Sequence, residues 1–230
     1  MWRHTGGRGR DVVCLILRAD RPVGVLRLTH PATRFSVPVS AGLPFVSLAA
    51  EEKIQREWDA YTTGFPMGLT PEPLWRDNRA LLCAYVDAQP IKRELESGAG
   101  VSPLTLTAEV LPHIARLHEA GLAHMDMSLS NILRDASKGK LLFVDFEYGA
   151  AAGLTFEQQC LYDYLRLLES VWKFLSPSER LSAAGTWGGA FFATAPAAVR
   201  AAEIAPLRPA ISRLLAAPEM RDFFGKLTVR

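Results

Sequence analysis

The stretch from Leu117 to Glu147 constrains this chain more than any other, because it places polar side chains at fixed spacings between apolar segments. It contains His124, Asp126 and Asn131 in the pattern His-x-Asp-x-x-x-x-Asn, and Asp145 follows in an Asp-Phe-Glu triplet. Phosphoryl transfer needs a carboxylate that orients an attacking hydroxyl group and oxygen ligands that hold Mg²⁺ on nucleotide phosphates. The spacing therefore predicts Asp126 as the orienting carboxylate, and Asn131 and Asp145 as metal ligands.

The apolar pattern around these polar residues predicts where they lie in the local structure. Apolar side chains recur at helical spacing over residues 110–117, and Gly121 stands where that helix would end. Residues 132–134 and 140–144 have the composition of two short strands joined by a polar turn. Pro112 falls inside the expected helix, so we expect a kink or a later helix start. A loop between helix and hairpin should therefore carry the catalytic residues.

This combination of motifs resembles the catalytic and metal-binding loops of the protein-kinase-like superfamily. Its Leu-His-x-x-Gly-x-x-His-x-Asp, Ser-Asn-Ile-Leu and Val-Asp-Phe-Glu segments are most similar to bacterial lipopolysaccharide-core (Kdo/heptose) kinases and aminoglycoside-phosphotransferase-type small-molecule kinases. The resemblance implies a two-lobed α+β fold, with an N-terminal lobe of strands and one helix over residues 1–87. A helical C-terminal lobe would comprise residues 88–230. The resemblance also implies ATP and Mg²⁺ as cofactors.

The resemblance implies further roles and reveals two departures from the family pattern. It implies structural support from His124 and from Asp163, whose carboxylate would accept hydrogen bonds from the catalytic-loop backbone. Met125 stands where regulated protein kinases have an arginine that reads a phosphorylated activation loop, and Glu147 stands where many have glycine. Both departures are common among the sugar kinases, and they argue against regulation by activation-loop phosphorylation.

The largest departure concerns the strand that in the family ends in lysine. Residues 12–18 and 23–28 read as a hairpin, and the second of these strands has Arg27 in the lysine position. Arg27 can carry positive charge to nucleotide phosphates, but its planar guanidinium is not equivalent to an ammonium group. No shift of register restores the family pattern, since the first lysine of the chain is Lys53.

A helix expected over residues 49–61 supplies a partner for this arginine. The family arrangement implies that Glu57 pairs with Arg27 and belongs to the nucleotide site. Glu51 and Glu52 are rivals for that role. A solvent-facing charge on an amphipathic helix is the ordinary role of such glutamates.

The remaining N-terminal segments carry weaker signals. Residues 1–10 are rich in glycine and arginine, and their glycines fall where the family has a glycine-rich loop over the phosphates. An N-terminal tail is the favoured interpretation, because almost no strand precedes these glycines. Residues 30–50 form a long apolar connection that is a candidate to contact a substrate. Residues 84–87 fit the connector between the lobes, whose backbone would receive adenine.

Composition excludes several other classes of protein. The chain has 230 residues, 49% of them hydrophobic, which suits one globular domain or two small lobes with a substantial core. A net charge of +2 with scattered basic residues argues against nucleic-acid binding. Cys14, Cys83 and Cys160 are too widely spaced for a disulfide framework or a zinc site. A reducing cytoplasm fits this cysteine usage best.

The sequence offers no strong candidate for a membrane span. The longest uncharged run, over residues 181–199, contains three glycines and a proline, and the N-terminus lacks the apolar stretch of a secretory signal. We therefore expect a cytoplasmic protein. A glycolipid acceptor would add peripheral contact with the inner membrane surface.

Together these observations predict an ATP- and Mg²⁺-dependent phosphotransferase that acts on a hydroxyl group. By the resemblance, its acceptor is a sugar or a lipopolysaccharide-core glycolipid, with a protein serine or threonine as the second choice. The rival hypothesis is a pseudokinase that binds nucleotide or partners without turnover, because of Arg27 and the abbreviated glycine segment. The complete set of Asp126, Asn131 and Asp145 favours the active enzyme.

Overall fold

The computed structural model describes residues 2–6, 11–29, 42–97 and 100–228. The chain divides into two compact units, each discontinuous in sequence. Unit 1 comprises Met1–Val39, Ser47–Gln89 and Leu133–Gly149, and unit 2 comprises Ser40–Val46, Pro90–Ile132 and Ala150–Arg230. These units do not have the bounds of the predicted lobes, which were divided at residue 87. Residues 133–149 were assigned to the C-terminal lobe but belong to unit 1.

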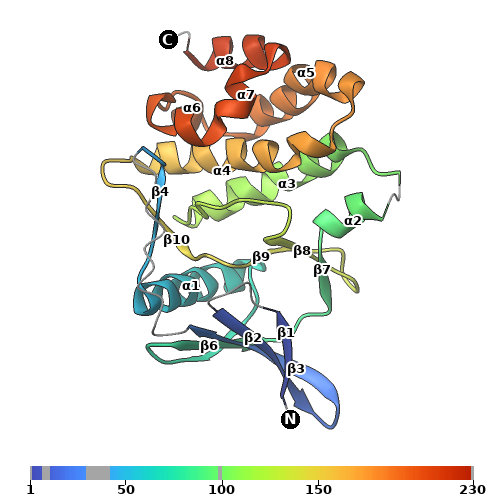
Figure 1. Cartoon of the computed structure of the whole chain (residues 1–230), viewed down its shortest axis with the longest axis vertical. Coiled ribbons are helices and arrows are strands. Elements are labelled where there is room, and N and C mark those ends of the chain that lie inside the picture. Colours follow the sequence, from blue (N-terminus) through green and yellow to red (C-terminus); the bar gives the residue numbers. More distant parts are fainter. Residues whose placement is uncertain (1, 7–10, 30–41, 98–99, 229–230) are drawn as a thin grey trace. The chain divides into compact units, whose positions relative to one another are not determined.

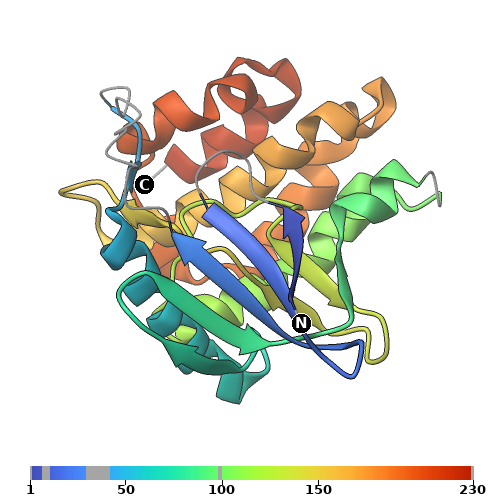
Figure 2. The same ribbon diagram turned by 60° about the horizontal axis from the view of Figure 1, so that its bottom comes forward.

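Unit 1 is built on an antiparallel sheet with the strand order β1-β2-β3-β6-β5 (Figures 1 and 2). Its strands are β1 (Trp2–Gly6), β2 (Asp11–Arg18), β3 (Arg21–Thr29), β5 (Pro73–Arg76) and β6 (Ala80–Ala84). Two smaller sheets have the orders β10-β4 and β7-β8-β9. Their strands are β4 (Phe45–Ser47), β7 (Ala88–Pro90), β8 (Ile132–Asp135), β9 (Leu141–Phe143) and β10 (Tyr148–Ala150).

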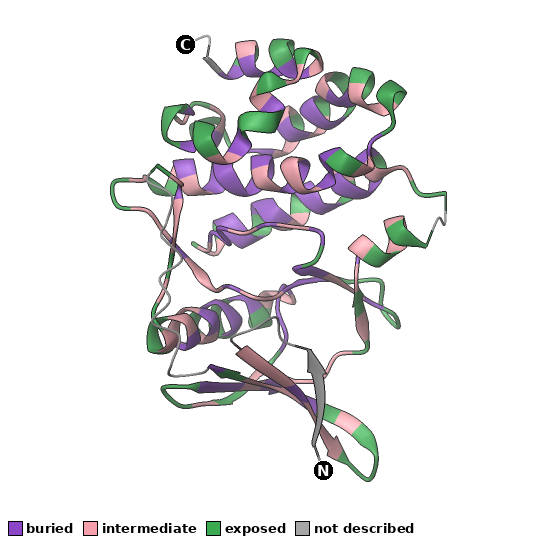
Figure 3. Ribbon diagram, viewed as in Figure 1, coloured by how far each residue is buried: buried purple, intermediate pink, exposed green. Residues whose placement is uncertain are grey.

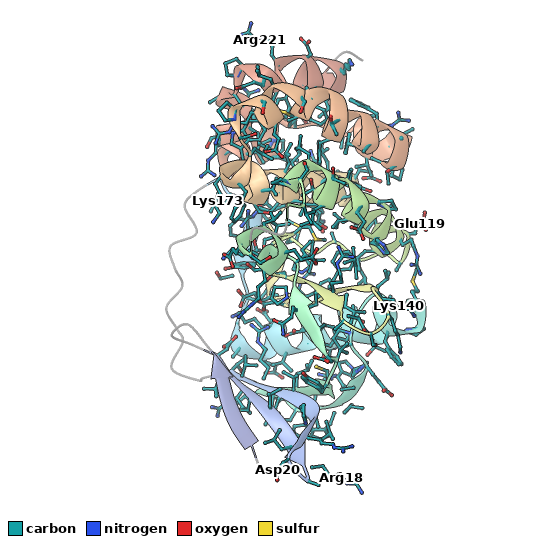
Figure 4. The ribbon with its side chains drawn as sticks, turned by 90° about the vertical axis from the view of Figure 1, so that its right-hand side faces the viewer. Arg18, Asp20, Glu119, Lys140, Lys173 and Arg221 are labelled. Atoms are coloured by element: carbon teal, nitrogen blue, oxygen red, sulfur yellow. The ribbon has the colours of Figure 1, made fainter. Side chains whose placement is uncertain are left out.

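The hairpin of β2 and β3 follows from its turn residues. Arg18 pairs with Arg21, and the two residues between them, Ala19 and Asp20, have φ of 48° and 60°. Two consecutive left-handed residues are the geometry of a tight hairpin turn, whose twist matches that of the strands. Arg18 and Asp20 mark this turn at the lower end of unit 1 in Figure 4. The antiparallel pairing with β6 then sets the position of Arg27 opposite Leu81.

Helix α1 (Ala50–Gly64) packs against β5 and β6. Its buried residues include Ile54, Ala60 and Tyr61, which form an apolar stripe at helical spacing. The Glu52 carboxylate accepts a hydrogen bond from the backbone N–H of Ala49 and so caps the first turn. The helix continues into a short 3₁₀ turn, η1 (Phe65–Met67).

Unit 2 is mainly helical, and the buried faces of its helices form a separate core. Buried residues are dense along α3 and α4, as Figure 3 shows, and α3 contacts both α4 and α5. The helices are α2 (Lys92–Glu96), α3 (Pro103–Glu119), α4 (Phe156–Val171), α5 (Pro177–Thr194), α6 (Ala197–Arg200), α7 (Ser212–Ala216) and α8 (Arg221–Thr228), with the 3₁₀ segments η2 (Trp172–Phe174), η3 (Ala205–Ile211) and η4 (Pro218–Met220). A mixed fold with a small antiparallel sheet and a larger helical part was predicted and is confirmed.

Helix α3 differs from its predicted form at the start and agrees with it at the end. A later start was one expectation from Pro112, but the helix begins at Pro103 and contains Pro112 in its interior. At the other end, the Gly121 N–H donates to the His118 carbonyl over 2.9 Å, and Gly121 has φ of 75°. The Leu122 N–H donates to the Leu117 carbonyl, which completes a glycine-ended helix cap.

The expectation of an N-terminal tail is wrong for residues 2–6. These residues form β1, which pairs antiparallel with β2. Strand pairing has overridden a local composition that favours loops. Residues 7–10, with two of the three glycines, and residues 30–41 of the long connection lie outside the described residues. Among the helices of the described ranges, none is both long and apolar enough to cross a membrane.

Candidate functional site

A single buried carboxylate in unit 2 holds the loop that follows α3. The Asp163 side chain has no exposed surface. Its Oδ2 accepts a hydrogen bond from the backbone N–H of His124 over 2.7 Å, and its Oδ1 accepts one from the N–H of Met125 over 2.8 Å. The Nε2 atom of His118 lies 3.1 Å from Oδ2. A buried charge requires such partners, so α4 fixes the loop backbone directly before Asp126.

The carboxylate of Asp126 is held at both oxygens. Arg166 on α4 donates from Nε to Oδ1 over 3.1 Å, and its Nη2 lies 3.0 Å from the same oxygen. The Nδ2 of Asn131 donates to the Asp126 carbonyl over 3.0 Å and to Oδ2 over 3.2 Å. The Asp126 side chain nevertheless remains 28% exposed. It is therefore oriented by its neighbours and still open to a hydroxyl group from solvent.

Two non-glycine residues, one in each unit, have a backbone conformation that L-residues rarely adopt. Met125 has φ of 67° and a fully buried side chain, and Asp145 has φ of 71°. Such conformations cost about 1–3 kcal/mol each and persist where the surrounding structure imposes them, often at functional sites. The local geometry thus singles out the residue before Asp126 and the predicted metal ligand itself.

Unit 1 contains a cluster of charges around Arg27. The Arg27 Nε and Nη2 donate to Oδ2 of Asp11 over 3.1 and 2.7 Å. Nη1 donates to Oε2 of Glu57 over 2.8 Å and also to Asp145 Oδ1. Nη2 further donates to Oε2 of Glu147 over 3.1 Å. A guanidinium has five N–H donors, so these contacts account for all of them.

Lys53 on α1 joins the same cluster. Its Nζ lies 2.7 Å from Oε2 of Glu147 and 3.5 Å from Oδ2 of Asp11. The cluster thus combines four carboxylates with two cations, which leaves two negative charges uncompensated when all groups are ionised. We use the name Arg27 cluster for Asp11, Arg27, Lys53, Glu57, Asp145 and Glu147.

The carboxylates of the Arg27 cluster raise the pKa of Arg27, and one of them also raises the pKa of the buried Tyr61 hydroxyl. Burial disfavours the charged guanidinium, but the carboxylates of Glu57, Asp145 and Asp11 outweigh it, and the pKa of Arg27 lies well above its ordinary value. The Tyr61 hydroxyl donates to Oε1 of Glu57 over 2.7 Å. Burial, with the charge of Glu57 added, raises the pKa of Tyr61 well above its ordinary value. Glu57 therefore has partners at both oxygens.

The predicted site residues fall into the two units. Unit 2 holds His124, Asp126, Asn131 and Asp163, and unit 1 holds Arg27, Glu57 and Asp145.

Several of these residues are in direct contact. The predicted pair of Arg27 and Glu57 is present as an ion pair, whereas the rivals Glu51 and Glu52 are exposed. Asp163 accepts the backbone hydrogen bonds that the resemblance implied, and His124 is fully buried. The catalytic and metal-binding roles of these residues stay predictions.

Sequence reasoning assigned no site role to Asp11, Lys53, Glu147 or Arg166. One signal was available: Lys53 precedes Glu57 by one helical turn, which places both side chains on one face of α1. Arg166 likewise follows Asp163 at a spacing that puts both on one face of α4. Asp11 and Glu147 had no such signal, because only the folded sheet and the chain after β9 bring them to Arg27.

The donor chemistry at these positions suits a hard divalent cation. Mg²⁺ prefers carboxylate and carbonyl oxygens, which Asp145 and the Asn131 amide supply. The Asp145 side chain is 38% exposed. Within the described residues, no group of three or more His, Cys, Asp or Glu side chains is arranged to hold a metal. The carboxylates of the Arg27 cluster face Arg27 and Lys53.

The sheet with its helix, the helical unit, and the His-x-Asp-x-x-x-x-Asn loop held by α4 together define a protein-kinase-like fold. No family model matches the chain. KEOPS complex subunit Bud32 of Pyrococcus abyssi (strain GE5 / Orsay) is 37% identical over 129 residues, which are 55% of this chain and 56% of that protein. The chain therefore spans about half the length of this curated relative.

Solved structures agree with this fold. The PknI kinase domain of Mycobacterium tuberculosis has a TM-score of 0.52 and 19% identity, with 98% of this chain and 93% of that chain covered. The Rio2 kinase-ADP/Mg²⁺-phosphoaspartate complex of Chaetomium thermophilum has a TM-score of 0.52 and 18% identity, with 98% and 68% covered. At these identities the likeness shows the fold, and it confirms the predicted fold class.

Proposed function

We propose that this protein is an ATP- and Mg²⁺-dependent phosphotransferase that acts on a hydroxyl acceptor. One observation carries the proposal: the Asp126 carboxylate is held at both oxygens by Arg166 and Asn131 and is still 28% exposed. A carboxylate fixed in this way can accept the hydrogen bond of an acceptor hydroxyl and orient its oxygen for attack.

Each residue has a role in this reaction. Bound Mg²⁺ and ATP would supply the transferable phosphoryl group and the positive charge that neutralises the phosphates. Asn131 and Asp145 would supply oxygen ligands for that cation. Asp126 accepts the proton of the acceptor hydroxyl as its oxygen bonds to the γ-phosphorus and the bond to the ADP oxygen breaks. Asp163 keeps the loop backbone in place during this exchange.

The acceptor we propose is a sugar or a lipopolysaccharide-core glycolipid. The preference comes from the motif resemblance, and two features of unit 2 support it. Met125, in the position of the arginine of regulated protein kinases, has a fully buried side chain. Helix α4 begins at Phe156, so only a short segment follows Glu147 before the helix that carries Asp163. A glycolipid acceptor would bring the protein to the cytoplasmic surface of the inner membrane, whereas a protein serine or threonine is the second candidate.

A pseudokinase is the alternative from another functional class. The observation in its favour is that Arg27, in the position of the family lysine, gives all five N–H donors to carboxylates. If no other cation reaches the phosphates, the protein could bind partners without turnover. The complete set of Asp126, Asn131 and Asp145 argues for the active enzyme.

The test is transfer of labelled phosphate from ATP to components of bacterial envelope extracts. Purified protein is incubated with γ-labelled ATP and Mg²⁺, and lipid-extractable, small-molecule and protein fractions are counted separately. We expect label in the glycolipid or sugar fraction with the wild type and none with Asp126→Ala. Label in the protein fraction alone would favour the second candidate. Mg²⁺-dependent ATP binding without transfer to any fraction would favour the pseudokinase.

A further inference from the structure

We propose that Lys53, on helix α1, provides the ammonium group that contacts the nucleotide phosphates in this protein, and that Arg27 serves as the structural centre of the carboxylates around it. This inference rests on the proposed function, since it assigns a residue of the same nucleotide site. In the family pattern, one lysine on the strand would both contact the phosphates and pair with a carboxylate. Here Lys53 would take the first role and Arg27 the second. The argument depends on which donors of each cation are already engaged.

Arg27 has no N–H donor left for a phosphate. Its five N–H groups donate to Asp11, Glu57, Asp145 and Glu147, and its side chain is only 12% exposed. A phosphate oxygen could bind Arg27 only after a carboxylate is displaced. The buried carboxylate of Glu57, 5% exposed, would then lose its cation. Losing that partner is costly, because an unpaired buried charge is strongly destabilising.

Lys53 differs from Arg27 in the donors that remain. Its ammonium has three N–H groups, and the described residues place two acceptors near it, Glu147 at 2.7 Å and Asp11 at 3.5 Å. The side chain is 19% exposed, more than that of Arg27. An ammonium group on a flexible stem can rotate its donors toward a new acceptor, which a planar guanidinium held at every nitrogen cannot do.

The position of Lys53 also fits a phosphate contact. It lies one helical turn before Glu57, whose carboxylate pairs with Arg27, so both α1 side chains reach the Arg27 cluster from the same helix face. The charge balance sets a condition on this contact. Because the cluster has two uncompensated negative charges, a phosphate alone would be repelled. The contact with Lys53 should therefore form only when a divalent cation accompanies the nucleotide.

A reactive nucleotide tests this inference on the wild-type protein. An acyl phosphate of ATP transfers its acyl group to a nearby lysine amine, with ATP as the leaving group, and the modified lysine is identified by mass spectrometry. We expect acylation of Lys53 that requires Mg²⁺ and is suppressed by excess ATP. Exposed Lys226 on α8 is the internal control and should be acylated equally with and without ATP. Protection of a different lysine, with Lys53 unmodified, would overturn the inference.

Variants give a second readout that does not depend on labelling. Lys53→Gln should raise the Kd for ATP in the presence of Mg²⁺ by about tenfold or more, as expected for one lost charge-assisted hydrogen bond. Lys53→Arg should recover part of that loss, and Lys226→Gln should match the wild type. Circular dichroism and urea unfolding of each variant exclude a folding defect. An unchanged Kd in a folded Lys53→Gln would contradict the inference.

Failure of the inference and failure of the proposed function give different results. If calorimetry detects Mg²⁺-dependent ATP binding by the wild type while Lys53 is neither acylated nor needed for affinity, the inference fails and the proposed function stands. If the wild type binds no ATP with Mg²⁺ present, the proposed function fails and the role of Lys53 is rejected with it.

Discussion

Nη2 of Arg166 lies 3.0 Å from Oδ1 of Asp126, and Nε of the same arginine donates to that oxygen over 3.1 Å. The pair connects α4 to the loop that follows α3, because Arg166 shares its helix with Asp163. One helix therefore fixes the backbone before Asp126 through a carboxylate and the Asp126 side chain through a guanidinium. Arg166 is a positioning residue for the proposed reaction.

Arg166→Gln should lower kcat by about 10- to 100-fold, since a small misplacement of a reacting group can cost this much. KM for ATP should change little, because the contact concerns the acceptor hydroxyl. The measurement is steady-state kinetics with circular dichroism to check folding. Arg213→Gln is the matched control, as Arg213 on α7 pairs with Glu169 and is 57% exposed. Equal kcat values for Arg166→Gln and the wild type would remove Arg166 from this role.

Asp126→Ala should abolish transfer and leave nucleotide binding nearly intact. The carboxylate acts mainly on the attacking hydroxyl, so its loss lowers kcat more than ground-state affinity. Labelled-ATP transfer and calorimetric ATP titration measure the two quantities separately. Turnover that stays within about tenfold of the wild type, a difference of about 1.4 kcal/mol in the barrier, would be incompatible with the assigned role.

Asp145→Asn should weaken ATP binding only in the presence of Mg²⁺. A hard divalent cation prefers a charged carboxylate oxygen to an amide, and Asp145 is the most exposed of the four carboxylates in the Arg27 cluster. Calorimetric ATP titrations with and without Mg²⁺, on variant and wild type, measure the difference. If Mg²⁺ has no effect on ATP binding by the wild type, the metal assignment is wrong and the pseudokinase is favoured.

Arg27→Met should lower the free energy of unfolding by about 3–5 kcal/mol, the usual cost when one partner of a buried ion pair is removed. Among the described residues, Lys53 would still pair with Glu147 and Asp11, whereas Glu57 and Asp145 would lose their ion pairs with Arg27. Urea unfolding measures this loss, and Mg²⁺ should restore part of it by compensating the negative charge.

The milder change Arg27→Lys should lower turnover. The lysine ammonium has three N–H donors on a shorter side chain, and these cannot replace the five N–H donors of the guanidinium. A rise in turnover would instead identify arginine as the defect of a pseudokinase.

The stability of the protein should fall as the pH rises above about 9. Burial raises the pKa of the Cys83 thiol from its ordinary value of 9.0 to about 12, and the charge of Glu57 adds to this shift. The unfolded chain therefore loses this proton at lower pH than the folded protein. The resulting stabilisation is complete below pH 9 and is lost as the pH rises toward 12. Urea midpoints from pH 8 to 11 should decline less steeply for Cys83→Ala, and equal slopes would contradict the assigned cause.

Much of the fold could be predicted from local sequence. The turn between β2 and β3 was predicted from the sequence after Arg18, where Asp20 tolerates a positive φ, and the end of α3 follows from Gly121. The start of α3 was missed although Pro103 at the first helical position was a signal. Strand β1 had no local signal, because its pairing with β2 is a tertiary contact.

The candidate site likewise has a part that could be predicted from the sequence and a part that could not. The spacing of Asp126, Asn131 and Asp145 lies within one stretch and is visible in sequence. The contacts of Lys53 with Glu147 and of Arg166 with Asp126 join residues far apart in the chain. Short-range patterns cannot indicate such pairs, since their geometry depends on how strands and helices pack.

The discontinuity of unit 1 has a consequence for how the protein is made. Asp11, Arg27 and Glu57 leave the ribosome well before Asp145 and Glu147, and residues 90–132 of unit 2 are synthesised in between. A nascent chain that ends before residue 145 therefore carries Arg27 without two of its carboxylates, those of Asp145 and Glu147. A domain that is continuous in sequence can fold as soon as it has been synthesised. Unit 1 cannot be completed until residues 133–149 have been synthesised. Fragments that stop at residue 89 should for this reason be unsuitable as isolated N-terminal domains.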